Sequence, residues 1–393
     1  MTRERRAAYH FAEATFAWKF WVQCDMSAIG VGMSAKPINS MQWESTSEGS
    51  VAMDFSKTRI EPEIDLQAEG KHGGFLRIPH SVHRSAYGWL PMPVMSIKNG
   101  DGPRVLLMSG NHGDEYEGQV TLCRLARNVE AQGIRGHLII LPMANYPAAH
   151  AGSRTSPLDD GNLNRSFPGD PNGTVTQMIA HFIEEVLLSG VDLLMDLHSG
   201  GSSLLYLPST QLKLQHDGTI HPRERELIAA YGAPYNHVEK PSPKETDNHS
   251  SGGARRNGAL FVSAEFAGAG TVSTDALGIC EQGLLRALHN FELLKTLPEG
   301  LAVPQVPRYL EIKAGEHYVY ASEDGLYEPL VELGDEVRAG DRAGAIHFPE
   351  TPWREPVVEH FLSDGLVVCK RIPGRSERGD CLFHLACDWS DES

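Results

Sequence analysis

Long apolar runs are missing from this chain, and no stretch reaches the ~18 consecutive apolar residues that a membrane-spanning helix needs. Cysteine is scarce, with six residues in 393 and none in CxxC spacing, so we expect a reduced, cytoplasmic setting without a disulfide framework. Positive charge is outnumbered, with 35 Lys and Arg against 51 Asp and Glu. The resulting formal charge of −16 disfavours binding to nucleic acid or to an anionic membrane surface.

Hydrophobic residues make up 41% of the chain, which is enough for a substantial core. The length exceeds what one ordinary domain needs, so we predict more than one domain. Residues 1–53 show no clear periodicity and are expected to be a disordered extension, or to precede a true start at Met41 or Met53. We predict a catalytic α/β domain over residues 54–300 and a β domain over residues 301–393.

Strand and helix patterns alternate in the first predicted domain. The expected strands are residues 104–109, 136–142, 191–197 and 260–266, and the expected helices are residues 118–130, 174–189 and 275–296. This alternation predicts a mixed, mostly parallel sheet with helices on both faces. Ligands bind such sheets beyond the carboxyl ends of the strands.

The amino-acid composition of the chain changes between Pro298 and Pro307. Short β-like runs follow, separated by glycines and Asp-Gly turns, at residues 309–313, 318–321, 326–331, 357–361, 366–370 and 381–386. We predict a small all-β domain similar to a biotinyl or lipoyl barrel sandwich. No lysine lies between Lys313 and Lys370, where a modified lysine would stand, so this similarity concerns the fold alone.

Two histidines and a glutamate have the pattern of an open metal site. His112 and Glu115 follow the first predicted strand, and His198 ends the third. Each histidine taken alone is more typical of an ordinary surface or loop position. Together, two imidazoles and one carboxylate are the ligand set of a catalytic zinc that keeps a position for water, so we predict a hydrolase with one Zn²⁺ per subunit. Asp196 could orient a ligand histidine from behind, and Glu265 ends the fourth strand at the same edge.

A polar loop follows the second predicted strand. It contains Arg154, Asn164 and Arg165 between turn residues. An arginine offers a planar fork that matches a carboxylate, which is typical of a substrate-binding loop. A solvated loop with surface arginines explains the same composition, and the spacing alone leaves both interpretations open.

Three sequence motifs resemble those of the succinylglutamate desuccinylase/aspartoacylase family. They are Gly-Asn-His112-Gly-Asp-Glu115, Asn-Leu-Asn164-Arg165-Ser-Phe167 and Asp196-Leu-His198-Ser-Gly-Gly. The resemblance covers roughly residues 60–390 and implies a zinc-carboxypeptidase-like fold followed by a β domain. It also implies that His112, Glu115 and His198 bind zinc.

Further roles are implied by the same resemblance. Glu265 matches the catalytic glutamate, and Arg154 is similar in placement to the arginine that stabilises the oxyanion. Asn164 and Arg165 match the pair that binds the substrate carboxylate. Arg255 resembles another substrate-binding arginine, although the arginine next to it leaves the register open.

A C-terminal tyrosine acts in part of the family. Tyr320 and Tyr327 are the candidates for this position.

The implied substrate is a small N-acyl amino acid. Within the family, the motifs are most similar to members of ectoine degradation that remove acetyl from Nα-acetyl-L-2,4-diaminobutyrate. Succinylglutamate and N-acetylaspartate remain alternatives, as do a zinc carboxypeptidase acting on short peptides and, least favoured, a non-catalytic binding protein. A diaminobutyrate amine would need a carboxylate nearby, and Asp159, Asp160 and Glu117 are available. The resemblance also implies a homo-oligomer.

Overall fold

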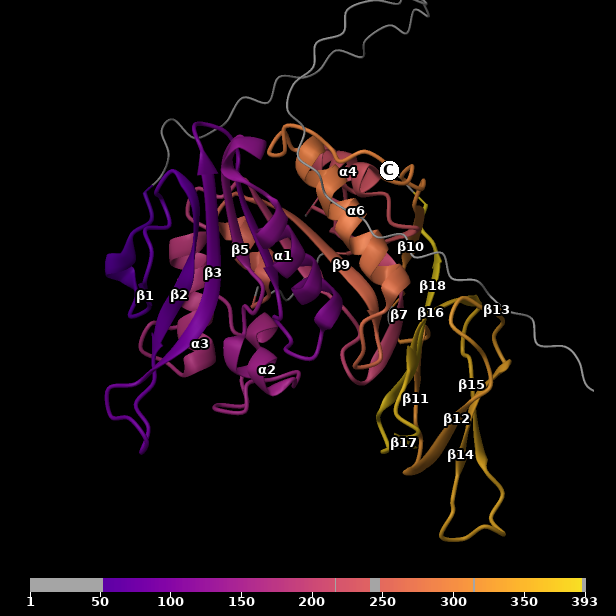
Figure 1. The fold of residues 1–393 in the computed structure, drawn as a ribbon. Helices are drawn as coiled ribbons and strands as arrows, with labels where there is room; N and C mark the ends of the chain where they lie inside the picture. The colour runs from indigo at the N-terminus through magenta and orange to yellow at the C-terminus, as the bar shows by residue number, and fades with distance from the viewer. Residues whose placement is uncertain (1–51, 216, 241–247, 314, 391–393) are drawn as a thin grey trace, which may run out of the picture. The chain divides into compact units, whose positions relative to one another are not determined.

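The computed structural model describes residues 52–390, apart from residues 216, 241–247 and 314 (Figure 1). The predicted disorder or late start of the N-terminal segment therefore lies largely outside the described residues. Met53, at the end of that segment, is 5% exposed and packs in a hydrophobic cluster. Within the described ranges, no helix is both long enough and apolar enough to cross a membrane.

The α/β region begins with short elements and a long hairpin and then alternates strands with helices. Its elements are η1 (Phe55–Lys57), β1 (Glu61–Pro62), β2 (Gly70–Pro79), β3 (Trp89–Asn99), β4 (Arg104–Ser109), α1 (Tyr116–Asn128), η2 (Ala131–Gly133), β5 (Gly136–Leu141), α2 (Tyr146–Ala151), η3 (Leu163–Arg165), α3 (Val175–Phe182), η4 (Ile183–Leu187), β6 (Leu193–His198), β7 (Leu204–Lys213), α4 (Pro222–Tyr231), β8 (Tyr235–Glu239), α5 (Ser250–Arg256), β9 (Leu260–Gly268) and α6 (Thr274–Asn290). Every strand and helix predicted for this region is confirmed. The hairpin β2–β3, strands β1, β7 and β8, helices α2, α4 and α5, and the short 3-10 helices are additional.

The central sheet is mixed, and its parallel strands lie in the middle. Strands β5, β4, β6 and β9 pair in parallel in that order, and all but β9 are buried throughout. Their apolar sequences suit strands that are covered on both faces. Antiparallel pairs on both sides of this block make the sheet less parallel than the sequence predicts.

Two hydrophobic clusters cover the two faces of the sheet, as predicted (Figure 1). Neighbouring residues of β4 show the division, because side chains alternate across a strand. Leu107 packs in one cluster with residues of α1, α4 and α6, whereas Leu106 packs in the other with residues of α3 and η4. The helices thus fix the sheet while leaving the carboxyl ends of β4, β6 and β9 for polar loops.

The C-terminal part of the described chain consists of strands without a helix. They are β10 (Arg308–Glu311), β11 (Tyr318–Tyr320), β12 (Gly325–Pro329), β13 (Glu336–Val337), β14 (Arg342–His347), β15 (Val357–His360), β16 (Gly365–Arg371), β17 (Arg375–Ser376) and β18 (Cys381–Asp388). Four of them form a separate sheet in the order β15-β14-β12-β17. The similarity to a barrel sandwich and the domain boundary near residue 300 remain predictions.

Other C-terminal strands extend the large sheet of the α/β region. Strand β10 pairs in parallel with β8, and β16 pairs with β7. Strand β18 pairs with both β10 and β16. This continuity brings C-terminal side chains, including Tyr318 and His384, to a cavity of the α/β region.

Candidate active site

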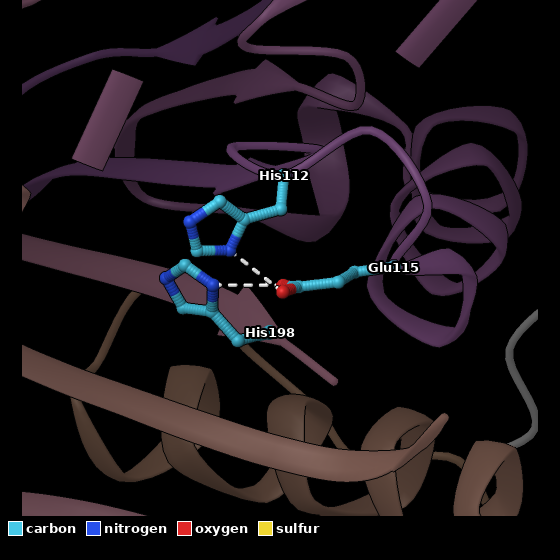
Figure 2. A group of neighbouring side chains, drawn as sticks. All are labelled: His112, Glu115 and His198. Atoms are coloured by element: carbon cyan, nitrogen blue, oxygen red, sulfur yellow. Dashed lines mark hydrogen bonds and ion pairs between the residues drawn. The ribbon is translucent and has the colours of Figure 1, made fainter. Parts of the chain in front are cut away.

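His112, Glu115 and His198 meet at the carboxyl edge of the parallel strands (Figure 2). His112 lies in the loop after β4, Glu115 caps the start of α1, and His198 is the last residue of β6. The Glu115 carboxylate lies 2.6 Å from Nδ1 of His112 and 2.8 Å from Nδ1 of His198. The predicted convergence is therefore present, and all three side chains are buried.

The far nitrogen of each imidazole faces an oxygen. Nε2 of His198 lies 3.0 Å from Oδ2 of Asp196, and Nε2 of His112 lies 3.2 Å from Oδ1 of Asn162. With a cation bound at the cluster, an N–H at Nε2 would donate to each oxygen, which would leave the Nδ1 lone pairs for the cation. The orienting position predicted for Asp196 is confirmed, whereas Asn162 was not anticipated from the sequence.

These contacts fit a cation at the centre of the cluster. In the tautomers that donate from Nε2, both Nδ1 atoms are acceptors, and the Glu115 carboxylate is an acceptor as well. Acceptors that converge on one point repel one another unless a positive charge lies between them. The ligand atoms lie within 4.8 Å of one another, so a single divalent cation could contact all of them.

Without a cation, the charges of this cluster depend on one another. Burial raises the pKa of Glu115, but His198 and His112 outweigh that effect and lower the pKa to about 2. Burial lowers the pKa of His198, whereas Asp196 and Glu115 raise it well above its usual value. The protein therefore keeps an ionised carboxylate at the point where a cation would bind.

Two glycines allow the ligand loops to approach their neighbours. A Cβ on Gly113 would lie 2.0 Å from the carbonyl carbon of Ala148, which no side chain could tolerate. Gly201 has a φ of 57° and packs against Asp114. The Asp114 carboxylate in turn accepts hydrogen bonds from the backbone N–H and hydroxyl of Ser202 at 2.8 and 2.7 Å. The His112 loop and the His198 loop are thereby joined.

Glu265 lies beside this centre because β9 pairs with β6. The register places Glu265 directly opposite His198. Oε2 of Glu265 is buried and has no hydrogen-bond partner within the described part of the chain. Burial, followed by Glu115, raises the pKa of Glu265 well above the ordinary value, although His198 and Arg154 oppose the rise. A carboxylate with a raised pKa and a free oxygen is suited to accept a proton and to return it.

Three residues of the predicted polar loop reach the same cavity. Nη1 of Arg154 lies 3.6 Å from the Glu115 carboxylate, and its side chain is half exposed. Arg165 and Asn164 line the cavity next to it. Oδ1 of Asn164 accepts a hydrogen bond from the backbone N–H of Ser250 at 3.0 Å. The arginines and the asparagine are therefore placed to contact an anionic ligand group.

The cavity has a volume of about 740 Å³ and extends from the metal cluster to strands β7 and β8. At one end lie the metal end residues, which we define as His112, Glu115, His198 and Glu265. At the other lies the β7–β8 wall, defined as Gln211, Lys213, His237 and Glu239, all of which line the cavity. None of the wall residues was identified from the sequence.

Arg255 is not among the residues that line this cavity. It lines a separate cavity of about 320 Å³ together with Glu224. The reason is helical geometry, because Ser250 and Arg255 are five residues apart on α5 and point about 140° apart. The substrate-binding role predicted for Arg255 thus lacks a position against the metal end.

Tyr320 and Tyr327 also lie outside the cavity lining. Tyr320 is 50% exposed, and Tyr327 is buried in the C-terminal hydrophobic cluster. Tyr206 and Tyr318 line the cavity instead, and the ring centroid of Tyr318 lies 4.6 Å from that of His384. A register shift between residues 319 and 320 disturbs the pairing of β11 with β18, and no sequence pattern indicated it.

A buried His-Glu-His cluster, with an unpaired glutamate beside it, defines a metallohydrolase-type site at the edge of an α/β sheet. Known proteins agree with this class. The description "succinylglutamate desuccinylase/aspartoacylase catalytic domain" belongs to a family model that matches residues 101–290. N-alpha-acetyl-L-2,4-diaminobutyric acid deacetylase of Halomonas elongata is 38% identical over 329 residues, which are 83% of this chain and 94% of that protein.

Solved structures give the same result. The product-bound ectoine utilization protein EutE of Ruegeria pomeroyi is 36% identical, with a TM-score of 0.79 over 84% of this chain and 99% of that one. A succinylglutamate desuccinylase/aspartoacylase of Rhodobacter sphaeroides is 35% identical, with a TM-score of 0.78 over 84% of this chain and 100% of that one. The chain belongs to the succinylglutamate desuccinylase/aspartoacylase family, and it is an enzyme of the hydrolase class.

Proposed function

We propose that this enzyme is a zinc-dependent deacetylase that removes acetyl from Nα-acetyl-L-2,4-diaminobutyrate during ectoine degradation. The observation that carries the proposal is the convergence of His112, Glu115 and His198 beside Glu265. The substrate is suggested by the deacetylase of Halomonas elongata, and ectoine degradation is suggested by the ectoine utilization protein of Ruegeria pomeroyi. The predicted cytoplasmic location and homo-oligomeric state belong to the same proposal.

The polar loop would bind the substrate carboxylate. Arg165 supplies a guanidinium, and Asn164 supplies a carboxamide whose oxygen is already bound to Ser250. The N–H groups of Asn164 are thus the atoms left for an anion. Together these two side chains present donors on one side of the cavity, which would turn the acyl group toward the metal end.

Nδ1 of His112, Nδ1 of His198 and the Glu115 carboxylate would hold one zinc ion. A zinc ion in such a set polarises a carbonyl oxygen and lowers the pKa of a water to about 7. Asp196 and Asn162 keep the imidazoles in the tautomer that presents Nδ1. Their contribution is orientation, because each fixes a ring that would otherwise rotate.

Glu265 would move the proton. As a carboxylate it takes a proton from the attacking water, and it returns that proton to the nitrogen of the leaving amine. A raised pKa makes the protonated form easy to reach, which suits the second step. Arg154 would stabilise the oxyanion that develops on the acyl carbonyl, an effect worth about 3–4 kcal/mol per donor in comparable sites.

A substrate panel tests the proposal. Zinc-loaded and chelated protein would be assayed with Nα-acetyl-2,4-diaminobutyrate, N-acetylaspartate, N-succinylglutamate and an unblocked dipeptide. We expect release of acetate from the first compound at the highest kcat/KM, and loss of that activity after chelation with recovery on adding zinc. A higher kcat/KM for the dipeptide would show a peptidase, and absence of turnover with all four compounds would contradict the proposed function.

A further inference from the structure

The β7–β8 wall of the cavity has no part in the mechanism described above. His237 and Glu239 are two residues apart in β8, so their side chains project from the same face of the sheet. Lys213 is the register partner of Glu239, and Gln211 is the partner of both His237 and Ser263. Because β7 also pairs with the strand of Glu265, one continuous polar surface connects the wall with the metal end.

Glu239 presents an acceptor to the cavity. The cation nearest to its carboxylate is Nζ of Lys213 at 3.9 Å, which is beyond hydrogen-bond distance. Lys213 instead donates to Oγ of Ser251 at 3.0 Å. The Glu239 side chain is 43% exposed, and it accepts no hydrogen bond from any residue that the structure describes.

Glu311 lines the same cavity and provides a comparison with Glu239, because its carboxylate lies near two lysines. It lies 3.5 Å from Nζ of Lys240 and 3.6 Å from Nζ of Lys313, and its side chain is 14% exposed. Two ammonium groups therefore lie within ion-pair distance of Glu311, whereas Glu239 has one such partner, at 3.9 Å, among the described residues. Of these two glutamates, Glu239 is the one with capacity to bind a cationic ligand group.

His237 adds a second unsatisfied group beside Glu239. His237 is 4% exposed, and neither ring nitrogen has a hydrogen-bond partner among the residues that the structure describes. Burial lowers the pKa of His237 to about 4, so the ring is neutral at pH 7 and one nitrogen is an acceptor. Buried polar atoms without partners are costly, which indicates that a ligand completes this position.

The sequence offered Asp159, Asp160 and Glu117 as carboxylates for a diaminobutyrate amine, but none of them reaches the cavity. Asp159 accepts hydrogen bonds from the backbone N–H and the hydroxyl of Thr176, at 2.8 and 2.9 Å. Glu117 is fully buried and accepts from the backbone N–H of Ser273. Neither of them lines the cavity, and Asp160 does not line it either.

We propose that Glu239, assisted by neutral His237, binds the free side-chain ammonium of the substrate and thereby selects a diamino acid. This inference rests on the proposed function for the identity of the reaction. An ammonium group has three donors and no acceptor, which matches a carboxylate and a neutral imidazole. An acidic side chain, as in N-acetylaspartate, would instead face the negative charge of Glu239.

Glu239 lines the same cavity as Arg165 and Glu265. Its charge acts on Arg165, where it opposes the lowering of the pKa by burial and by Arg154. Its charge also acts on Glu265, adding to the rise in pKa caused by burial and Glu115. Glu239 therefore lies within electrostatic reach of both the carboxylate-binding loop and the reacting centre.

The decisive experiment compares two substrates that differ only in the amine. Nα-acetyl-2,4-diaminobutyrate and Nα-acetyl-2-aminobutyrate would be assayed with the wild-type enzyme and Glu239→Gln. We expect the ratio of their kcat/KM values to fall by about tenfold or more in the variant, chiefly through KM. An unchanged ratio, including an equal loss on both substrates, would overturn the proposal.

Glu311→Gln is the matched control, since it removes the same charge from a carboxylate that already has two lysines within ion-pair distance. We expect the substrate ratio to stay unchanged in Glu311→Gln. A fall equal to that in Glu239→Gln would mean that general cavity charge, rather than a subsite at Glu239, selects the substrate.

A binding measurement separates this subsite from the proposed reaction. Calorimetry would compare 2,4-diaminobutyrate with 2-aminobutyrate, using zinc-loaded wild-type protein and Glu239→Gln. We expect wild-type protein to prefer the diamine and the variant to lose that preference. If the wild-type enzyme deacetylated neither substrate, the proposed function would fail, yet this preference would still support the subsite. Equal binding of the two amino acids by wild-type protein would reject the subsite even if deacetylation were observed.

Discussion

The two ends of the cavity are built in different ways. The metal end takes its side chains from four separate elements, which are the loop after β4, the start of α1, the end of β6 and the strand β9. The β7–β8 wall takes all of its side chains from two paired strands, and Lys213 and Glu239 are the last residues of these strands. At the metal end, His112, Glu115 and His198 contact one another, whereas neither the His237 ring nor the Glu239 carboxylate has a hydrogen-bond partner among the described residues. A preformed cluster suits chemistry that is common to a family, and an unsatisfied surface suits the choice of substrate.

Removal of a ligand histidine should give the largest effect and would test the metal end directly. His198→Ala removes one of the two Nδ1 atoms that would bind the metal, and it leaves Glu115 and Asp196 without their shared partner. We expect zinc to be lost and turnover to become undetectable, as measured by metal analysis after dialysis and by acetate release. His289→Ala, on the exposed face of α6, serves as the control and should retain both. Stoichiometric zinc and full activity in His198→Ala would place the metal elsewhere.

Glu265→Gln separates proton transfer from metal binding within the same end. The variant keeps the shape of the side chain but cannot accept a proton. We expect kcat to fall by about 10²–10⁴-fold, the usual range for general acid–base catalysis, while zinc content is unchanged. A normal kcat would assign the base to another residue, and loss of zinc would show that Glu265 supports the metal ligands.

Arg154→Gln should have the next largest effect, and its pH profile is informative. The charge of Arg154 opposes the rise in the pKa of Glu265, so its removal raises that pKa further. Activity requires the ionised base and is lost as pH falls through this pKa. We therefore expect the acidic limb of kcat/KM to move to higher pH, together with a loss of about 10²–10³-fold in kcat. A limb that moved to lower pH would contradict the arrangement.

The smallest effect is expected on the pH dependence of stability, from His237 in the β7–β8 wall and from His384 in β18. Burial lowers the pKa of His237 and of His384 to about 4, against an unperturbed value of 6.5. Between these values the unfolded chain binds more protons than the folded one, so stability falls as pH decreases from about 6.5 to 4. Each pKa unit corresponds to about 1.4 kcal/mol. His237→Gln should reduce the slope of unfolding free energy against pH, measured by denaturant titration, and an unchanged slope would show that His237 titrates normally.

The contrast between the two ends also explains what could be predicted from the chain. Strands β4, β5 and β6 are continuous apolar runs, because parallel strands covered on both faces need them. Strand β7 contains Pro208, Gln211 and Lys213, and β8 contains Asn236, His237 and Glu239. Polar side chains beside a cavity interrupt the hydrophobic pattern, so these two strands were not predicted.

The metal ligands could be chosen from the sequence because they lie in short glycine-containing motifs at the ends of recognisable strands. The family resemblance suggested Arg255 and Tyr320, and the charge of a diaminobutyrate amine suggested Asp159, but none of the three lines the cavity. Arg255 is directed by its place on α5, and Tyr320 by the register shift in β11. Asp159 is held by its hydrogen bonds to Thr176 at the start of α3. Each of these depends on packing against distant residues.

The chain alone thus sufficed for the α/β class, the family resemblance and the convergence of His112, Glu115 and His198. These features follow from local apolar periodicity and from residues a few positions apart at the ends of strands. The tertiary structure decided which side chains complete the cavity, because Glu239, His237 and Tyr318 reach it through the pairing of β7 with β8 and of β11 with β18. Pairing between segments far apart in sequence depends on the whole sheet, and no local pattern encodes it.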